Sequence, residues 1–291
     1  MTPHAHILIV LYNKKIEESE SVDSLLNSEV SSVDLHIHNN GPCKVELSED
    51  LVLLFKSKNI KVSLCNCIDN KPLSLLYNDF IFSISDYNKI VILDDDTTIT
   101  TSFALQIMNG NCDVTLPRII SRGDNKEYYP LKNGDLLINY GVLDTIHNIW
   151  SIGSGIIVSK KTVDVFAEHK IKLFDEHYAL YGVDISFFRN LWILEKRGVK
   201  FRVCVDSILV HSLSRVETVQ SEFRVRERLI DIAITARRYP STRKLLSFCK
   251  QIVKHIVKGH FKISIIAISC FLSGIHPRIS AWKVRQERSI S

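Results

Sequence analysis

Short β-rich runs alternate with helically spaced apolar residues in the first hundred positions. The β-rich runs predict strands at 6–12, 33–40, 60–67 and 89–95. The segments between them place apolar residues three or four positions apart and predict helices at 18–28, 48–59 and 73–85. Strands that are apolar on both faces are typical of parallel sheets covered by helices, so this half is predicted to be Rossmann-like.

The pattern becomes less regular beyond residue 100, but three further regions can be interpreted. Residues 150–169 predict a strand followed by a helix. The amphipathic stretch 182–198 predicts a helix ending at Gly198, a residue type common at helix C-termini. Residues 199–215 return to a strand pattern. We therefore expect one α/β domain over 1–240, with halves at 1–100 and 101–240.

The segment 242–262 has apolar residues on one face of a predicted helix and basic residues on the other. The apolar set is Leu245, Leu246, Cys249, Ile252, Val253, Ile256 and Val257, and the basic set is Arg243, Lys244, Lys250, Lys254 and Lys258. Basic amphipathic helices are typical of segments that lie on anionic membranes. The apolar run 263–275 is too short to span a bilayer.

We predict that 241–291 is a helical tail that associates with a membrane. An alternative is a helix that covers the core of the domain itself. Nucleic-acid binding is disfavoured, because aromatic residues are not interleaved with the basic ones.

The charge is distributed unevenly along the 291 residues. The formal net charge is +5, from 37 Lys and Arg against 32 Asp and Glu. From residue 212 onward there are 16 basic and 5 acidic residues, a net charge of +11, which leaves −6 for residues 1–211. This asymmetry indicates a basic tail that meets an anionic surface.

The seven cysteines are scattered, and only Cys65 and Cys67 are close in sequence, without the spacing of a metal knuckle. We expect reduced, buried thiols in a cytosolic protein. The N-terminal stretch has no charged region or cleavage site of a signal peptide and is predicted to be the first strand. No apolar run reaches the ~18–20 residues that a membrane-spanning helix needs.

Three consecutive carboxylates, Asp94, Asp95 and Asp96, follow the buried strand predicted at 89–95. Such charges repel by about 1 kcal/mol per pair in water, and by more where water is scarce. A divalent metal that bridges a diphosphate could offset this repulsion. The alternatives are an aspartyl nucleophile, because Asp94-x-Asp96-x-Thr98 fits a phosphatase pattern, and a polar strand end in which Thr97, Thr98, Thr100 or Thr101 caps the next helix.

The position of the triplet favours the metal. The phosphatase pattern normally lies on the first strand of its domain, whereas three strand–helix units precede it here. The chain contains no G-x-G-x-x-G and no G-x-x-x-x-G-K-[ST] loop, so no glycine loop can cradle phosphates. In an extended chain Asp94 and Asp96 point to one side and Asp95 to the other.

Six short motifs in order resemble family 2 glycosyltransferases, especially the bacterial rhamnosyl- and galactofuranosyl-type enzymes of surface-polysaccharide synthesis. They are "ILIVLYNK" (7–14), "IHNNGP" (37–42), "NKPLSLLYN" (70–78), "VILDDDT" (91–97), "KLFDEHYALYGVDISFFRNL" (172–191) and "LVHSLSR" (209–215). The segment "IGSGIIVSKKTVDVF" (152–166) resembles the family's acceptor region. Two positions depart from the family pattern, since His38-Asn39-Asn40 replace an Asp at the base pocket and Pro72 replaces a Gly.

The resemblance implies a GT-A fold: a Rossmann-like, mostly parallel sheet flanked by helices, here followed by a C-terminal basic amphipathic tail. It implies that 1–100 binds the nucleotide sugar and 101–240 the acceptor. Asp96, Asp94 and His211 would hold Mn²⁺ or Mg²⁺, and the imidazole favours Mn²⁺. Asp184 would be the general base of an inverting transfer.

The resemblance also implies two groups of binding residues. The donor-binding set is Tyr12, Asn13, Asn40, Asn70, Asn78 and Asp95, and the acceptor-binding set is Trp150, Gly153, Ser154, Gly155 and Tyr181. The alternative role of Trp150 and Tyr181 is packing in the core. Asp175 and Glu176 could merely shape the turn before Tyr178. For Asp184 the alternative role is to cap the helix that follows it.

The expected function is transfer of a sugar from a nucleoside-diphosphate sugar to a polyprenyl-diphosphate-linked oligosaccharide, in O-antigen or capsule synthesis. We expect a cytoplasmic protein, peripheral on the inner face of the bacterial cytoplasmic membrane, that binds no nucleic acid. The sequence leaves the oligomeric state, the nucleotide, the sugar and the linkage open. The alternatives are a phosphatase that uses Asp94 as nucleophile and a non-catalytic scaffold of the same fold.

Overall fold

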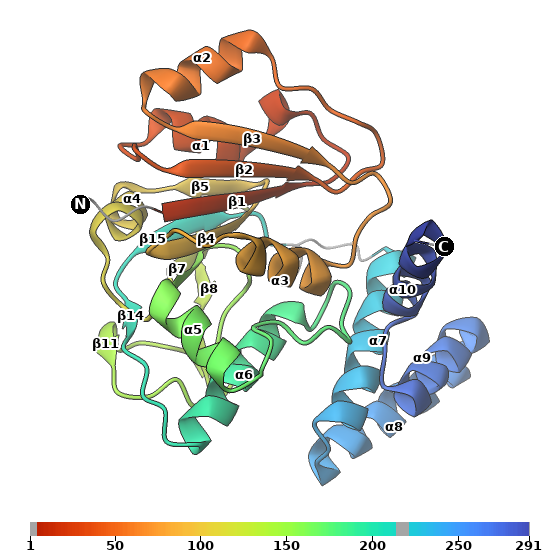
Figure 1. The fold of residues 1–291 in the computed structure, drawn as a ribbon. Coiled ribbons are helices and arrows are strands. Elements are labelled where there is room, and N and C mark those ends of the chain that lie inside the picture. The colour runs from red at the N-terminus through yellow and green to blue at the C-terminus, as the bar shows by residue number, and fades with distance from the viewer. Residues whose placement is uncertain (1–4, 214–220, 291) are drawn as a thin grey trace. The chain divides into compact units, whose positions relative to one another are not determined.

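The computed structural model describes residues 5–213 and 221–290, and the chain divides into two compact units (Figure 1). The first unit comprises 1–70, 80–173 and 187–216, and the second comprises 71–79, 174–186 and 217–291. Two helices, α3 (Leu73–Ser83) and α6 (Val183–Lys196), begin in the second unit and continue in the first. The domain boundary expected at 240/241 stays a prediction.

An eight-stranded sheet forms the centre of the first unit, in the order β11-β14-β6-β13-β4-β1-β2-β3. The four strands predicted in the first hundred residues are parallel neighbours in it: β1 (Ala5–Leu11), β2 (Asp34–Asn39), β3 (Lys61–Asn66) and β4 (Lys89–Asp94). The other half is mixed: β13 (Ile156–Ser159) runs antiparallel to β4 and to β6 (Val114–Thr115), and β14 (Val203–Val205) lies between β6 and β11 (Gly141–Leu143). The strictly parallel part is therefore the half that the apolar runs predicted.

Serine and threonine side chains cap the N-termini of four helices of this unit. They cap α1 (Glu20–Asn27), α2 (Glu49–Ser57), α4 (Thr101–Asn109) and α5 (Lys160–Glu168), each accepting a hydrogen bond from a backbone N–H of the first turn. Thr100 caps α4, so the capping alternative for the threonines after the acidic triplet is correct for this one residue. The short 3-10 helix η1 (Ile16–Glu18) precedes α1. Phe55 and Phe103 pack in the core with the strands.

Two smaller sheets complete the first unit. One has the order β5-β15-β7-β8 and contains β5 (Thr97–Ile99), β15 (Ile208–His211), β7 (Arg118–Ser121) and β8 (Glu127–Tyr129). The other contains β10 (Asp135–Leu136), β9 (Leu131–Lys132) and β12 (Ile149–Trp150). Part of the predicted strand 199–215 is thus β15, while Ser214 and Arg215 lie outside the described residues.

The second unit is helical. It contains α7 (Glu222–Arg238), α8 (Thr242–Val257), α9 (Phe261–Ser273) and α10 (Pro277–Ile290). Helix α7, which the hydrophobic pattern did not single out, packs against both α8 and α9. A buried hydrogen bond joins α7 to the turn before α10, with His276 Nε2 3.0 Å from Glu227 Oε2. The helical C-terminal tail is therefore present as predicted.

The cysteines differ from the expectation of reduced, buried thiols. Cys112 and Cys204, which are 92 positions apart, form a disulfide with a Cα–Cα distance of 6.0 Å. Cys43, Cys65 and Cys249 are exposed, and Cys270 is buried. The prediction of a reduced thiol was wrong for Cys112 and Cys204, because nothing local to Cys112 indicates that β14 brings Cys204 beside it. The prediction of burial was wrong for the three exposed cysteines, and Cys270 is free and buried as predicted.

Candidate functional site: the acidic turn after β4

The three consecutive aspartates form a turn between β4 and β5, and they differ in what their side chains contact. Asp94 is the last residue of β4, and Thr97 is the first of β5. Asp94 and Asp96 face His211, whereas Asp95 contacts Lys14. The split agrees with the prediction made for an extended chain, although Asp95 and Asp96 lie in a turn. The turn therefore presents a pair of carboxylates on one side and a neutralised carboxylate on the other.

Asp94, Asp96 and His211 form a group in which one ligand atom from each residue lies within 4.8 Å of the others. His211 Nδ1 is 3.1 Å from Asp96 Oδ1, and His211 Nε2 is 3.8 Å from Asp94 Oδ2. An imidazole that donates its Nδ1 hydrogen to Asp96 keeps the lone pair on Nε2, the nitrogen nearer to Asp94. Two carboxylates and one imidazole are a donor set that suits Mn²⁺ and other divalent ions.

Strand pairing brings His211 to the turn across more than a hundred residues. β15 runs antiparallel to β5, so that His211 is opposite Thr97, one residue after Asp96. Thr97 Oγ1 lies 3.0 Å from His211 Nδ1. The side chain of His211 is 8% exposed. A buried imidazole held by a neighbouring hydroxyl keeps one ring orientation, which is how metal-ligating histidines are usually positioned.

Two serine hydroxyls fix the backbone of the turn. Ser154 Oγ accepts a hydrogen bond from the N–H of Asp94 at 3.0 Å and lies 2.7 Å from Thr97 Oγ1. Ser21 Oγ donates to the carbonyl of Asp94 and accepts from the N–H of Thr97 at 2.9 Å. Both serines are buried. The turn is thus held at both ends from α1 and from the segment before β13, a role that the sequence did not indicate for either residue.

Asp95 is balanced by a positive charge from the segment after β1. Lys14 Nζ lies 2.8 Å from Asp95 Oδ1, and the backbone N–H of Tyr12 donates to Asp95 Oδ2 at 3.5 Å. Both of these charged side chains are partly buried. Lys14 was not among the residues predicted from the sequence, although a basic residue shortly after a parallel strand is a usable signal. Repulsion within the triplet is therefore relieved on one side by Lys14.

The predicted donor-binding residues of the first unit gather at the carboxyl ends of β1, β2 and β3. The N–H of Asn13 donates to the carbonyl of Gly41 at 2.7 Å, and Asn40 Nδ2 donates to Asn70 Oδ1 at 3.4 Å. Tyr12 is 52% exposed, so its ring is accessible to a ligand. Ligands of open α/β sheets bind outside the carboxyl ends of the strands, the edge at which Asp94 also lies.

Asn78 and Glu176 belong to the second unit and contact each other. The side chain of Asn78 is buried, and its amide donates to the carbonyl of Phe174 at 2.8 Å and to Glu176 Oε1 at 3.1 Å. It also accepts from the N–H of Phe174 at 3.1 Å. Both amide hydrogens are used within the protein, so these contacts assign Asn78 to holding the chain at Phe174 rather than to donor binding.

Asp184 lies in the first turn of α6, in the second unit, and is half-buried. The carbonyl of Gly182 accepts the N–H of Ser186 at 2.9 Å, so that Gly182 occupies the N-cap position. The alternative that Asp184 caps this helix is therefore wrong. Gly182 has a φ of +82°, and a Cβ there would lie 2.3 Å from Asp231 Oδ1, so only glycine fits.

Asp175 has a structural role in the second unit. Burial alone would raise its pKa, but hydrogen bonds from His177, Arg238 and Tyr239 outweigh burial and hold the pKa well below its usual range. This carboxylate ties the turn before α6 to the end of α7. Tyr181, predicted to bind the acceptor, has the guanidinium of Arg228 5.4 Å from its ring centroid.

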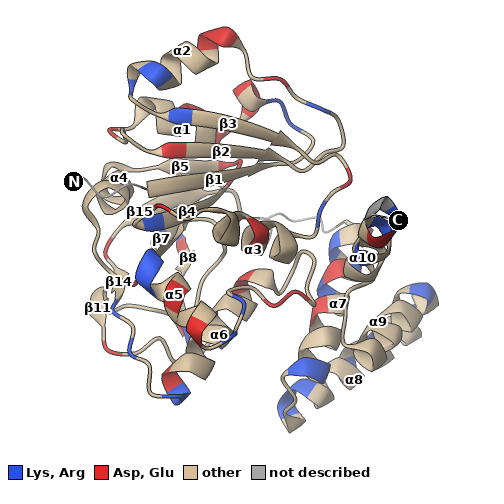
Figure 2. Cartoon of the chain, viewed as in Figure 1, with Lys and Arg blue, Asp and Glu red and all other residues tan. Residues whose placement is uncertain are grey.

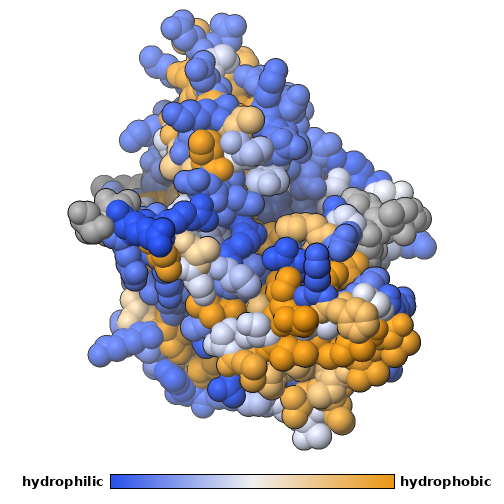
Figure 3. Space-filling view, turned by 90° about the vertical axis from the view of Figure 1, so that its right-hand side faces the viewer, coloured by the Kyte–Doolittle hydropathy of each residue, from blue (hydrophilic) through white to orange (hydrophobic). Residues whose placement is uncertain are grey.

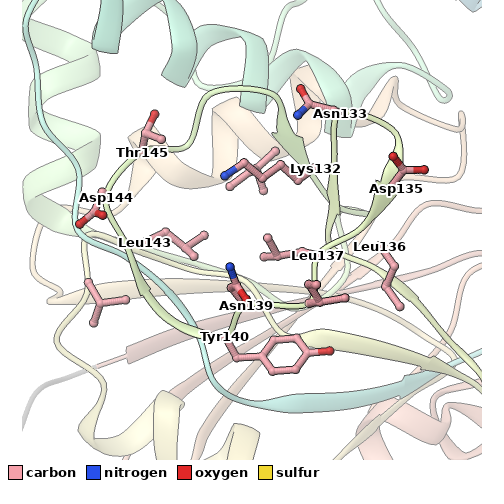
Figure 4. A pocket seen from close by; sticks show the side chains of 13 residues that line it. Lys132, Asn133, Asp135, Leu136, Leu137, Asn139, Tyr140, Leu143, Asp144 and Thr145 are labelled. Carbon is pink, nitrogen blue, oxygen red and sulfur yellow. The ribbon is translucent and has the colours of Figure 1, made fainter.

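The remaining acceptor candidates lie around β12 and β13. The ring of Trp150 is 6.0 Å from that of Trp192. Gly155 has a φ of +91°, and a Cβ there would lie 2.2 Å from Leu209, which explains the glycine by packing. Residues that come shortly before Trp150 in the sequence line a pocket of about 480 Å³, and Figure 4 shows 13 of their side chains, from Lys132 to Ile149. It offers Lys132, Asp135, Asp144 and Tyr140, groups that can hydrogen-bond sugars.

A second cluster of ligand-type residues, His6, Asp34 and His36, lies at the amino ends of β1 and β2. His6 Nδ1 is 2.9 Å from His36 Nε2, the ring centroids are 5.1 Å apart, and the ring planes differ by 14°. These values describe two nearly coplanar rings placed end to end with a hydrogen bond between the facing nitrogens. The cluster is therefore a hydrogen-bonded histidine pair beside Asp34, unlike the group at the acidic turn.

No family model and no curated protein sequence matches the chain. The structure is similar to that of TarS from S. aureus. The crystal structure of TarS 1–349 in complex with UDP-GlcNAc has a TM-score of 0.54 and 14% identity, covering 95% of this chain and 83% of that one. A second crystal structure of TarS 1–349 has a TM-score of 0.53 and 11% identity, covering 94% of this chain and 92% of that one. The predicted GT-A fold with a helical tail is thereby confirmed.

Proposed function

We propose that the protein is a metal-dependent glycosyltransferase that uses a nucleoside-diphosphate sugar. The observation that carries this proposal is the group of Asp94, Asp96 and His211 at the carboxyl edge of a parallel sheet. The GT-A fold adds support, and the TarS structures with UDP-GlcNAc and with UDP support a nucleotide-sugar donor. A bound divalent ion would supply Lewis-acid stabilisation of the departing diphosphate.

The residues around the turn have distinct tasks in this proposal. Asp94, Asp96 and His211 hold the ion, and Ser21 and Ser154 keep the turn in one conformation. Tyr12, Asn13, Asn40 and Asn70 border the nucleotide at the ends of the first strands. Lys14 neutralises Asp95 and thereby lowers the repulsion within the triplet. Asp95 supports the segment after β1 through these contacts.

Asp184 is the general base in this reaction. Its carboxylate takes the proton from the acceptor hydroxyl as that oxygen attacks the anomeric carbon, and the diphosphate leaves from the opposite side. A single displacement of this kind inverts the configuration of the sugar. The start of α6 at Val183 places Asp184 within the first turn of the helix and not at its N-cap position.

The acceptor is a polyprenyl-diphosphate-linked oligosaccharide of bacterial surface-polysaccharide synthesis, such as O-antigen or capsule. Trp150 and the neighbouring pocket of residues 132–149 offer aromatic and hydrogen-bonding groups for its sugars. The transfer takes place at the inner face of the cytoplasmic membrane. Support for this location comes from the sequence resemblance and from the basic C-terminal helices (Figure 2).

Calorimetry with UDP, dTDP and GDP in the presence of Mn²⁺ tests the donor. We expect one nucleotide to bind, and its binding to be lost without the metal and in the Asp96→Ala variant. Sugar transfer from the matching donor to a synthetic lipid diphosphate acceptor then tests the reaction. If none of the three nucleotides binds, the chain is a scaffold of this fold. Trapping of beryllofluoride on Asp94 would instead identify a phosphatase.

A further inference from the structure

Helix α8 has more apolar residues than its packing within the second unit uses. Only Phe248 and Ile252 of this helix are buried, and Phe248 stacks on Phe271 of α9 with centroids 4.9 Å apart. The other apolar residues face solvent: Leu245, Leu246, Cys249, Val253, Ile256 and Val257. Among them Val257 is 82% exposed and Leu246 65%. The apolar face predicted from the sequence is therefore mostly not the packing face.

The exposed apolar residues of α8 form a continuous stripe. At about 100° per residue, the six side chains occupy about 120° of the helix circumference, next to the sector that holds Phe248 and Ile252. Arg243, Lys244, Lys250, Lys254 and Lys258 occupy the sector on the other side of the stripe. Helix α8 thus has three faces: one packed, one apolar and exposed, and one basic.

Helix α9 also has a packed face and an exposed apolar face, but Lys262 is its one basic residue. Phe261, Ile265, Ile268 and Leu272 lie four, three and four positions apart, and each is between 39% and 69% exposed. Ile263, Ala267 and Cys270 are buried on the opposite side of the helix. In Figure 3 hydrophobic side chains gather into an extended orange area, to which α8 and α9 contribute. An exposed apolar stripe on both helices needs a partner that is itself apolar.

The charge around these stripes has one sign. Residues 242–291 contain ten Lys and Arg and one acidic residue, Glu287. Among the described residues no single helix is long and apolar enough to cross a membrane, and the pair α9 and α10, which passes by length and composition together, is bent by 66°. An apolar stripe bordered by lysines is the composition of a helix that lies in the plane of an anionic bilayer.

We infer that the exposed stripes of α8 and α9 form a docking surface for an anionic phospholipid bilayer. The apolar side chains enter the headgroup–acyl boundary, and the lysines next to them contact lipid phosphates. This inference extends the proposed function, because the bilayer is the partner that would hold the lipid-linked acceptor. Its own evidence, exposure and charge, does not depend on the sugar transfer.

Sedimentation of the full chain with vesicles tests the surface. We expect binding to phosphatidylcholine vesicles that contain phosphatidylserine, at least tenfold stronger than binding to pure phosphatidylcholine and weakened by salt. Leu246→Glu with Val257→Glu, and separately Ile265→Glu with Leu272→Glu, should each weaken this binding at least tenfold. These four side chains are exposed, so the changes leave the packed face intact.

The matched control is Leu53→Glu with Leu54→Glu on α2, which changes two equally exposed leucines of the first unit and should leave vesicle binding unchanged. Variants that keep a single exposed cysteine give a second measurement. A fluorophore on Cys249 should report an apolar environment when anionic vesicles are added, and one on Cys43 should not.

Several results would overturn the inference. They are no binding to anionic vesicles, equal binding by the glutamate variants, or a dimer that these variants disrupt without any vesicle binding. The last result would identify a second copy of the chain as the partner. Nucleotide binding to Mn²⁺ and protein in solution is measured without vesicles, so failure of the proposed transferase is distinguishable from failure of the docking surface.

Discussion

The acidic turn and the α8–α9 surface both contain groups in energetically unfavourable surroundings, but only at the turn do other residues of the chain contact and stabilise these groups. At the turn, three carboxylates are held close together by buried serines, a histidine and a lysine from distant parts of the chain. On α8 and α9, apolar side chains are left in solvent although a packed face is available beside them. Both arrangements cost free energy in the isolated protein, and the partner that we propose for each, a divalent cation in the first case and a membrane in the second, would offset that cost.

The largest expected effect comes from Asp96→Ala. Removing this carboxylate takes away the contact to His211 and one of the three metal donors, so nucleotide binding in the presence of Mn²⁺ should fall by at least about 100-fold, and sugar transfer should be abolished. Calorimetry and a transfer assay measure both. Asp95→Asn is the matched control, with a loss of at most about tenfold, because Asp95 faces Lys14. Equal losses in the two variants would contradict the division of the triplet.

Asp184→Asn should separate chemistry from binding. Loss of a general base lowers kcat by about 10²–10⁴-fold. Nucleotide binding with Mn²⁺ should stay within about twofold of the wild type, because the metal group belongs to the first unit. Vesicle binding should also be unchanged. A variant with full kcat would assign Asp184 a different role.

Ser154→Ala tests whether the turn depends on its supporting hydroxyls. The variant leaves the N–H of Asp94 without its acceptor, and we expect about a tenfold loss of metal affinity. Ser63→Ala is the matched control at the other end of the strands, where the hydroxyl bonds His36. Manganese titration followed by electron paramagnetic resonance measures the free ion in both variants. Unchanged affinity in Ser154→Ala would show that the turn holds its shape without this serine.

The smallest effect concerns the contrast between buried and exposed lysines. Burial lowers the pKa of Lys89 in β4 to about 8, and its ammonium donates to the carbonyls of Gln106 and Gly110. Between pH 8 and 10 the unfolded chain binds more protons at this residue than the folded one. Its contribution to the free energy of unfolding should therefore rise with pH by on the order of 1–2 kcal/mol.

Urea unfolding of the wild type and Lys89→Met at pH 7.5, 8.5 and 9.5 measures the slope of the free energy of unfolding against pH. The part of this slope that comes from Lys89 should be absent in the variant. Above pH 10 Tyr87 acts in the opposite direction, because burial and Asp164 raise its pKa to about 12. Lys250→Met, an exposed lysine of α8, should leave the slope as in the wild type. A parallel pH dependence in wild type and Lys89→Met would contradict the role of burial.

The predictions that succeeded rest on local patterns. The four parallel strands were recognised as short β-rich runs, and the helices between them by apolar residues at a spacing of three or four. The amphipathic tail was recognised for the same reason. The alternation of side chains separated Asp95 from its two neighbours.

The predictions that were wrong concern partners that are distant in the chain. The expectation of reduced thiols failed at Cys112 and Cys204, because strand pairing brings them together across 92 positions. The cap alternative for Asp184 failed because α6 begins at Val183, two residues earlier than a cap at Asp184 requires, after Gly182 with its positive φ. The hydroxyls of Ser21 and Ser154 gave no signal, since serine is common in loops and only their burial beside the turn gives them a task.

The sequence by itself determined which segments are apolar, where the carboxylates fall relative to the strand, and that the C-terminal region is basic. These features depend on spacings of two, three or four residues, so they do not depend on how the rest of the chain folds. Only the tertiary structure decided which side of α8 is packed and which is exposed, because burial depends on the neighbours that α7 and α9 supply. It also decided that a histidine joins the aspartates of the segment 89–99 in a candidate metal site, because the register of β15 against β5 places His211 opposite Thr97.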